Sequence, residues 1–337
     1  MKRIFELDII RSIACMMVVA MHAPMISDNA NGIFLSSLSY ITAPCIGLFF
    51  MVSGALLLPC KEDDGRVFIK KRFSKIAFPT LFWSLFYITI NLTKGENDET
   101  LIKELTSILF SAQGNGVLWF MYTLMGLYLI TPIISRWLHA CSKKEVEFYL
   151  ILWVVTLCYP ILKLFIITNQ TDTGILYYFS GYAGYMLLGY YMKKYPDAIK
   201  WKILLPATII SFIAPIACKI THIKVDFYSL FWYLSIFVVI VCVAWFKIIM
   251  QDGGKIIKSE KIKNVIIKFS NLSFGIYLMH IFVMRTILWQ QEWIINIDSY
   301  ILQTVILTLL TLFVSYIICS LISKLPLSEY IIGYKKK

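Results

Sequence analysis

Long apolar segments recur along the whole chain, and they constrain its fold more than any other sequence feature. Each is about 20 residues long, the length of an α-helix that crosses a hydrocarbon layer about 30 Å thick. Only 15% of the 337 residues are charged and 59% are hydrophobic, too little polar surface to cover a water-soluble domain. We therefore predict an all-α integral membrane protein with a bundle of about ten transmembrane helices. The predicted spans are residues 8–27, 38–59, 76–93, 116–135, 148–167, 175–192, 203–217, 229–249, 269–288 and 299–322.

The lysine and arginine residues concentrate in alternate loops between the predicted spans. If the N-terminus lies inside, the inner segments hold 24 of the 32 basic residues and the outer segments hold four. Loops that face the cytoplasm are enriched in these residues, so both termini are predicted to be cytoplasmic. The net charge of +12 therefore reflects the topology first of all. A cytoplasmic face this basic also attracts anionic lipid headgroups, and nucleic acid is not a predicted partner.

No feature divides the chain, so residues 1–337 are predicted to form a single membrane-embedded domain. The sequence has no fixed-period repeat and no low-complexity tract, and its first apolar segment lacks the cleavage site of a signal peptide. Residues 99–111 differ from the spans, because their apolar side chains follow one helical face. This pattern is typical of a helix along the outer membrane interface, where it either covers an acceptor site or leads into the next span.

The sequence shows no pattern of metal ligands. Its eight cysteines are scattered singly, which favours small packing residues over disulfides or a metal cluster. His139 and His222 lie in or near loops, far along the chain from any group of carboxylates or cysteines. We therefore predict no metal site.

Arg11 and His22 are ionisable residues inside the first predicted span. A charge near the bilayer centre costs at least about 2.5 kcal/mol on insertion scales, so each should face the bundle interior or a watery cavity. Eleven residues of helix bring the two within about 20° of one face and separate them by about 16 Å along the axis. Both are thus predicted to line one pathway, with Arg11 near the cytoplasm and His22 in the outer half.

Structural roles for these residues stay open alternatives. Asp8 lies one turn before Arg11 and an ion pair would fix the guanidinium. His22 is either a neutral imidazole bonded across helices or a general base, because histidine titrates near neutrality. His280 and Arg285 lie in the ninth predicted span and are expected at the depth of His22.

Five motifs, taken in order, resemble those of the bacterial membrane acyltransferase-3 family of ten-helix O-acyltransferases. LDIIRSIACMMVVAMH at 7–22 is similar to the family's opening Leu-Asp-x-x-Arg and its Arg-x10-His signature, and FFMVSG at 49–54 to its Phe-Phe-x-x-Ser-Gly. KRFSK at 71–75 resembles the Arg-x-x-Arg element, although Lys75 replaces the second arginine and supplies only a point charge. LWFMYTLMGLYLITP at 118–132 and SFGIYLMH at 273–280 resemble the fourth helix and the closing Tyr-Leu-x-His.

The resemblance implies a transferase that moves an acyl group, usually acetyl from cytoplasmic acetyl-CoA, to a hydroxyl of an envelope sugar or polysaccharide outside the membrane. It also implies a site in the bacterial cytoplasmic membrane that needs no metal. On this interpretation Arg11, Arg72 and Lys75 bind the phosphates of acyl-CoA, and His22 removes the proton of the acceptor hydroxyl. An acyl-imidazole intermediate is the alternative to direct transfer.

Six further residues are predicted to support the site: Asp8, Ser53, Trp119, Tyr277, His280 and Arg285. Ser53 and the glycine after it serve either close helix packing or a narrow wall with a hydroxyl donor beside the acyl arm. Trp119 and Tyr277 are either interfacial anchors or contacts to the substrate. The sequence does not predict an oligomeric state.

Two other function classes fit part of the pattern. A transporter or flippase would also place buried arginine and histidine along one groove, but matching Gly and Pro interruptions in the two halves of the chain are not seen. A purely structural membrane subunit would leave the cost of Arg11, His22 and Arg285 without a function.

Overall fold

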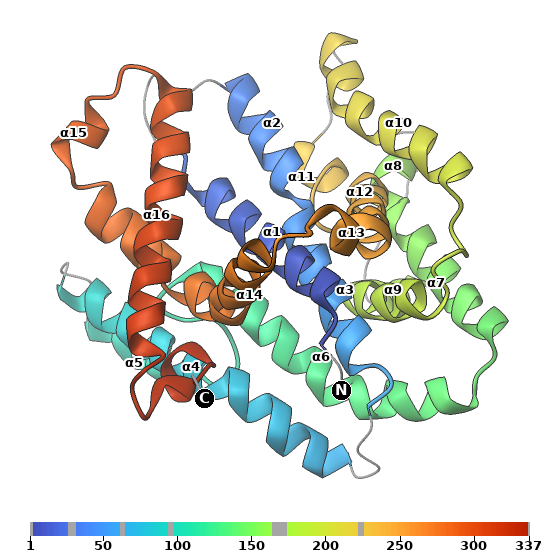
Figure 1. Ribbon diagram of the computed structural model, residues 1–337, viewed down its shortest axis with the longest axis horizontal. Coiled ribbons are helices and arrows are strands. Elements are labelled where there is room, and N and C mark those ends of the chain that lie inside the picture. Colours follow the sequence, from blue (N-terminus) through green and yellow to red (C-terminus); the bar gives the residue numbers. More distant parts are fainter. Residues whose placement is uncertain are drawn as a thin grey trace. The chain divides into compact units, whose positions relative to one another are not determined.

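The computed structural model describes residues 3–25, 32–60, 65–93, 98–163, 174–221 and 226–335, and within them the regular secondary structure is entirely helical (Figure 1). Eight helical segments of this described part are long and apolar enough to cross a membrane. They are Gly32–Leu57, Gly65–Thr93, Gly116–Ala140, Lys143–Leu162, Trp201–Cys218, Ile236–Ile256, Glu260–Leu288 and Tyr300–Ile322. The all-α class and the multi-pass membrane character are therefore confirmed. The number of ten spans and the side on which the termini lie stay predictions.

The predicted span 175–192 is not one α-helix. Residues Tyr177–Phe179 form a short 3-10 helix, η2, and the α-helix α9 covers only Ala183–Lys194. Between them Gly181 has a φ of 90°, a left-handed conformation that ends helical geometry. The prediction was wrong in the first part of this span, because its apolar composition conceals the break.

A second interruption divides the predicted span 229–249. The short helix α11 (Phe227–Leu230) ends before α12 (Ile236–Ile248) begins. Ser235 separates them, because its Oγ accepts a hydrogen bond from the amide of Phe237 and donates one to the carbonyl of Leu230. A serine that caps one helix and satisfies the end of another favours a break even within an apolar segment.

The chain divides into two compact units, and each is formed by segments distant in sequence. Four of the five boundaries between the units fall within the helices α1 (Phe5–His22), α2 (Gly32–Thr42), α6 (Trp119–Ala140) and α14 (Glu260–Ile281), and the fifth follows Pro59. The first unit comprises Met1–Met17, Ser36–Pro59 and Ile134–Ile266. The second comprises Val18–Leu35, Cys60–Ile133 and Ile267–Lys337.

In the first unit, helices α3 and α9 form the closest packing (Figure 1). A Cβ on Gly54 of α3 would overlap the backbone of Met186 in α9, and a Cβ on Gly189 of α9 would overlap the backbone of Met51. Glycine at both positions lets the two backbones touch. Here α3 is Pro44–Leu57, and besides α9, η2, α11 and α12 the complete helices of this unit in the described part are α7 (Lys143–Leu157), α8 (Tyr159–Leu162), α10 (Trp201–Ile220), the π-helical η3 (Ile249–Gly253) and α13 (Gly254–Ile256).

In the second unit, the C-terminal helix α17 packs on α4 and α16 packs on the π-helical segment η4 that continues α14. The indole of Trp83 in α4 donates a hydrogen bond to the carbonyl of Ile331 at 2.9 Å, which joins the C-terminal segment to α4. The complete elements of this unit are α4 (Gly65–Thr93), α5 (Asp98–Ser107), η1 (Gly116–Leu118), η4 (Phe282–Leu288), α15 (Glu292–Ile295), α16 (Tyr300–Ile322) and α17 (Ser328–Ile332).

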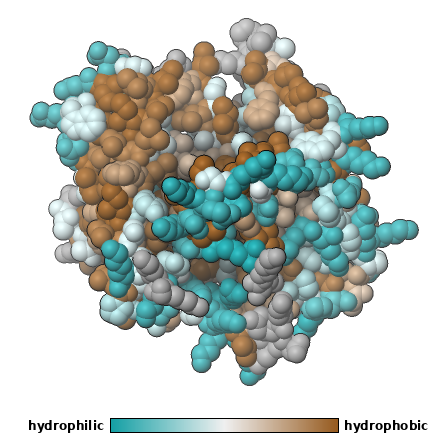
Figure 2. Space-filling view, in the orientation of Figure 1, coloured by the Kyte–Doolittle hydropathy of each residue, from teal (hydrophilic) through white to brown (hydrophobic). Residues whose placement is uncertain are grey.

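Apolar side chains are exposed along α16 in the second unit and along α10 in the first (Figure 2). On α16, for example, Leu309 and Phe313 are exposed, whereas Thr311 and Ser315 on the opposite face are buried. A helix that is apolar outside and polar inside is suited to lipid rather than water. The segment predicted to lie along the interface also forms a helix, α5, and its position at the membrane surface stays a prediction.

Candidate active site

Two imidazoles lie next to each other in the second unit. His22 is the last residue of α1, and His280 lies in the last turn of α14. Their ring centroids are 5.4 Å apart and the ring planes are inclined by 39°. His280 is completely buried and His22 is partly exposed. The structure thus brings together two residues that the sequence expects at one depth, although they are 258 positions apart.

His280 uses one of its two ring nitrogens within its own helix. Its Nδ1 lies 2.5 Å from the carbonyl oxygen of Tyr277, one turn earlier. Its Nε2 is buried, and among the described residues it has no hydrogen-bond partner. This is an unusual state, because the large majority of buried polar side-chain atoms are hydrogen-bonded.

Arg285 is the cation of this cluster. It lies in η4, five residues after His280, where α14 continues in π-helical geometry. Its guanidinium carbon lies 5.2 Å from the ring centroid of Trp289, a cation–π arrangement that restrains an exposed arginine. The site therefore combines two imidazoles with one guanidinium.

Tyr87 of α4 fixes the point at which α14 changes to π-helical geometry. Its hydroxyl donates a hydrogen bond to the carbonyl of Leu278 at 2.9 Å and accepts one from the amide of Phe282 at 3.3 Å. These two groups flank His280 in the chain. Sequence reasoning missed Tyr87, because nothing in the spacing of its aromatic segment distinguishes it from a residue that faces lipid.

An aromatic series extends from His280 towards the start of α6. The ring centroid of Tyr277 lies 5.7 Å from that of His280 and 5.5 Å from that of Phe120. Trp119, the first residue of α6, lies 6.2 Å from Phe120. The hydroxyl of Tyr277 donates a hydrogen bond to the carbonyl of Val117. Both predicted aromatic residues therefore belong to the second unit, and Tyr277 contacts the imidazole cluster directly.

Arg72 and Lys75 lie one turn apart on α4 of the same unit. Lys75 is exposed and Arg72 is partly buried. The Nε of Arg72 is buried and, among the described residues, has no hydrogen-bond partner. An N–H group of this kind is suited to a ligand that supplies oxygen acceptors, such as a phosphate.

The remaining predicted residues lie in the first unit. The carboxylate of Asp8 is buried and accepts two hydrogen bonds from the guanidinium of Arg3, at 2.6 and 2.8 Å. Arg11 lies on the next turn of α1 and is partly buried. The hydroxyl of Ser53 donates to the carbonyl of Phe49 at 3.0 Å, so its proton is used within its own helix. The glycine that follows Ser53 serves close packing against α9, the first of the two roles predicted for this motif.

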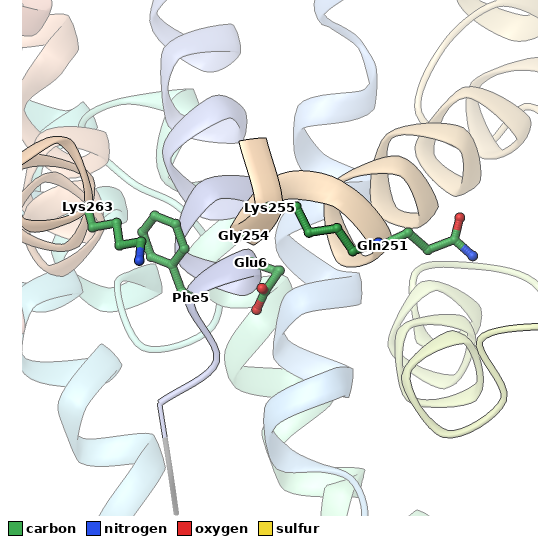
Figure 3. A pocket seen from close by; sticks show the side chains of 6 residues that line it. All are labelled: Phe5, Glu6, Gln251, Gly254, Lys255 and Lys263. Atoms are coloured by element: carbon green, nitrogen blue, oxygen red, sulfur yellow. The ribbon is translucent and has the colours of Figure 1, made fainter. Parts of the chain in front are cut away.

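An open cavity of about 310 Å³ lies at the start of α1 in the first unit (Figure 3). Its two lysines are paired with neighbouring carboxylates, Lys255 with Asp252 and Lys263 with Glu260. The carboxylate of Glu6 adds a negative charge, so the cavity has no excess of positive charge for phosphates. We therefore do not place the acyl donor there. The cavity is lined by Phe5, Glu6, Gln251, Gly254, Lys255 and Lys263.

No three histidine, cysteine, aspartate or glutamate side chains of the described part come together in a group that could hold a metal ion. His139 is exposed at the end of α6. His222 lies outside the described residues.

Comparison with known proteins identifies a family for the chain. Residues 4–320 match a family model described as an acyltransferase domain, Acyl_transf_3. The matched range includes all ten residues predicted for the site. No curated protein and no solved structure matches the chain.

Proposed function

Because the chain belongs to the acyltransferase-3 family, we propose that this multi-pass membrane protein transfers an acetyl group from cytoplasmic acetyl-CoA to a hydroxyl of an extracytoplasmic envelope sugar or polysaccharide. Acyl transfer itself follows from the family. The observation that carries the assignment of a site is the pair of imidazoles His22 and His280, 5.4 Å apart beside Arg285. Acyl transfer to an alcohol needs a base that removes the proton of the attacking hydroxyl, and an imidazole can do so.

In the proposed reaction His22 is the general base. The oxygen of the acceptor hydroxyl attacks the thioester carbonyl carbon as its proton passes to a ring nitrogen of His22. The carbon–sulfur bond then breaks, and the CoA thiolate leaves and takes up the proton. The partial exposure of His22 supports this role, since a base must be accessible to the acceptor.

Arg285 is the proposed electrostatic partner of the reaction. The carbonyl oxygen gains negative charge in the tetrahedral intermediate, and a fixed cation lowers the energy of that charge. The place of Arg285 in η4, five residues after His280 at the end of α14, supports this role. Its contact with the ring of Trp289 would hold the guanidinium in place.

The donor phosphates are proposed to bind Arg11, Arg72 and Lys75. The unpartnered Nε of Arg72 supports this assignment, because guanidinium N–H groups bind phosphate oxygens strongly. Arg11 lies on the same continuous helix as His22, in keeping with a donor that extends along α1 from the cytoplasm. Asp8, Ser53, Trp119 and Tyr277 are proposed to support the site by packing and orientation.

The proposed location is the cytoplasmic membrane of a bacterium, with both termini in the cytoplasm. Lipid, acyl-CoA and a carbohydrate acceptor are the proposed partners. The uneven distribution of basic residues supports this topology.

The test is transfer of labelled acetyl from acetyl-CoA to candidate envelope sugars by the purified protein in lipid nanodiscs. We expect transfer by the wild type, and a loss of about 100-fold or more in His22→Ala. His139→Ala is the matched control, because His139 is exposed and lies outside the imidazole cluster. Full transfer by His22→Ala would remove His22 as the base. If the wild type neither transfers acetyl nor turns over acetyl-CoA with any acceptor, but moves a sugar across a vesicle membrane, the transporter hypothesis replaces this one.

A further inference from the structure

The hydrogen bond between His280 and the backbone defines which of its nitrogens can accept a proton. A carbonyl oxygen only accepts hydrogen bonds, so the Nδ1 that contacts the carbonyl of Tyr277 must carry the hydrogen. In the neutral imidazole the other nitrogen, Nε2, is then an acceptor with a lone pair. His280 is thus oriented by its own helix and presents an acceptor.

The Nε2 acceptor is buried and, within the described part of the chain, unpartnered. Among the described residues, the charged, titratable or hydroxyl-bearing side chains recorded near the His280 ring or the adjoining backbone are His22, Arg285, Tyr277 and Tyr87. Tyr277 and Tyr87 both direct their hydroxyl hydrogens to backbone carbonyls, those of Val117 and Leu278. Of the two remaining side chains, His22 lies against the His280 ring, with the centroids 5.4 Å apart, whereas the guanidinium of Arg285 lies over the ring of Trp289.

We propose that His280 is a positioning residue for His22, an inference that rests on the function proposed above. In the working enzyme the Nε2 of His280 accepts a hydrogen bond from one ring N–H of His22. A centroid separation of 5.4 Å leaves facing nitrogens of two imidazoles about 3 Å apart, which is hydrogen-bond distance once a ring rotates into line. The bond selects the tautomer of His22 whose other nitrogen is free to take the acceptor's proton.

The arrangement resembles that of other catalytic bases that a neighbouring group orients. Such a group holds the imidazole in the tautomer that can accept the proton, and it stabilises the imidazolium that forms. Here the chain of contacts runs from the carbonyl of Tyr277 through His280 to His22. The proton leaves the acceptor hydroxyl, resides on His22 while the carbon–sulfur bond breaks, and passes to the CoA thiolate. His280 gains and loses no proton in this sequence.

Two substitutions separate this role from packing. The side-chain amide of asparagine reaches the place of Nδ1, so His280→Asn keeps a donor to the carbonyl of Tyr277 but offers nothing at Nε2. The side-chain oxygen of glutamine reaches the place of Nε2, so His280→Gln keeps the acceptor. If His280 only fills space, both variants resemble the wild type or both are impaired.

We expect His280→Asn to lower kcat by about 10- to 100-fold with little change in the KM for acetyl-CoA, as loss of an orienting partner does. His280→Gln should stay within about threefold of the wild type. His139→Gln is the control for a histidine outside the site. An undiminished kcat in His280→Asn, or equal losses in the two variants, would overturn the proposal.

A second measurement does not depend on the variants' folding or on turnover. The chain has only four histidines, so ¹⁵N-histidine labelling of the wild type gives few ring signals to assign. We expect one buried histidine to be neutral with its hydrogen on Nδ1, and assignment of the opposite tautomer to His280 would contradict the inference. An inactive wild type would count against the proposed function, whereas an active wild type with a fully active His280→Asn would count against this inference alone.

Discussion

Gly54 in α3 lies directly against the backbone of Met186 in α9, so closely that a Cβ at position 54 would overlap the carbonyl oxygen of Met186. The contact is reciprocal, because Gly189 of α9 meets Met51 of α3 in the same way. Such a crossing cannot relax by a change of rotamer, since the opposing atoms belong to the main chain. The small residue after Ser53 is therefore a requirement of helix packing.

Gly54→Ala is accordingly expected to destabilise the protein by about 1–3 kcal/mol or more, the usual cost of overpacking. The measurement is the thermal unfolding midpoint in detergent. Gly126→Ala is the matched control, because a Cβ on Gly126 of α6 would meet no atom within 4 Å. If both variants unfold at the wild-type temperature, the close approach of α3 and α9 is contradicted.

Tyr87→Phe is expected to weaken the end of α14. Loss of the hydroxyl leaves the carbonyl of Leu278 and the amide of Phe282 without the partner that Tyr87 provides, at a cost of about 1–3 kcal/mol for a buried group. A lower unfolding midpoint and a reduced kcat should appear together, because these groups flank His280.

The control for this change is Tyr228→Phe, since Tyr228 is 63% exposed and lies in the first unit. It should leave both the unfolding midpoint and the kcat of the enzyme unaltered. Wild-type behaviour of Tyr87→Phe would show that the hydroxyl does not hold this turn.

The helical membrane fold could be predicted because a chain that crosses lipid must form long apolar helices. The length and hydropathy of a segment identify such helices directly. The same measure failed where polar geometry acts inside an apolar segment. It missed the left-handed Gly181 and the capping Ser235, each of which ends a helix without changing the hydropathy. It also began the third span at residue 76, whereas α4 begins at Gly65, since basic residues continue a helix beyond the apolar core.

The candidate site shows a similar division. His22 and Arg11 stood out because a charge in an apolar helix is costly, and the motif ending at His280 drew attention to that residue. Their spacing along the chain could not place His280 beside His22, nor show that Tyr277 orients it, because those relationships depend on how α14 packs. Tyr87 had no sequence signal at all, since its role depends on two backbone groups of another helix.

The lysine at position 75 offers a test of the donor site by gain of function. Arg72 and Lys75 are one turn apart on α4, and the family motif that they resemble has arginine at both positions. Guanidinium can bind a phosphate through two parallel hydrogen bonds, whereas an ammonium supplies a point charge. Lys75→Arg is therefore expected to lower the KM for acetyl-CoA by about two- to tenfold, and Arg72→Lys to raise it about tenfold, with kcat little changed in both.

Arg136→Lys is the matched control for these substitutions, because Arg136 is an exposed arginine outside the proposed donor set. The measurement is the initial rate of acetyl transfer over a range of acetyl-CoA concentrations at one fixed salt concentration, since screening alone changes phosphate binding. A rise in KM for Lys75→Arg, or a loss in kcat with unchanged KM for Arg72→Lys, would place the phosphates elsewhere. The direction in which Lys75→Arg changes the KM for acetyl-CoA is the most decisive result, because an arginine with a purely structural role would not improve the binding of acetyl-CoA.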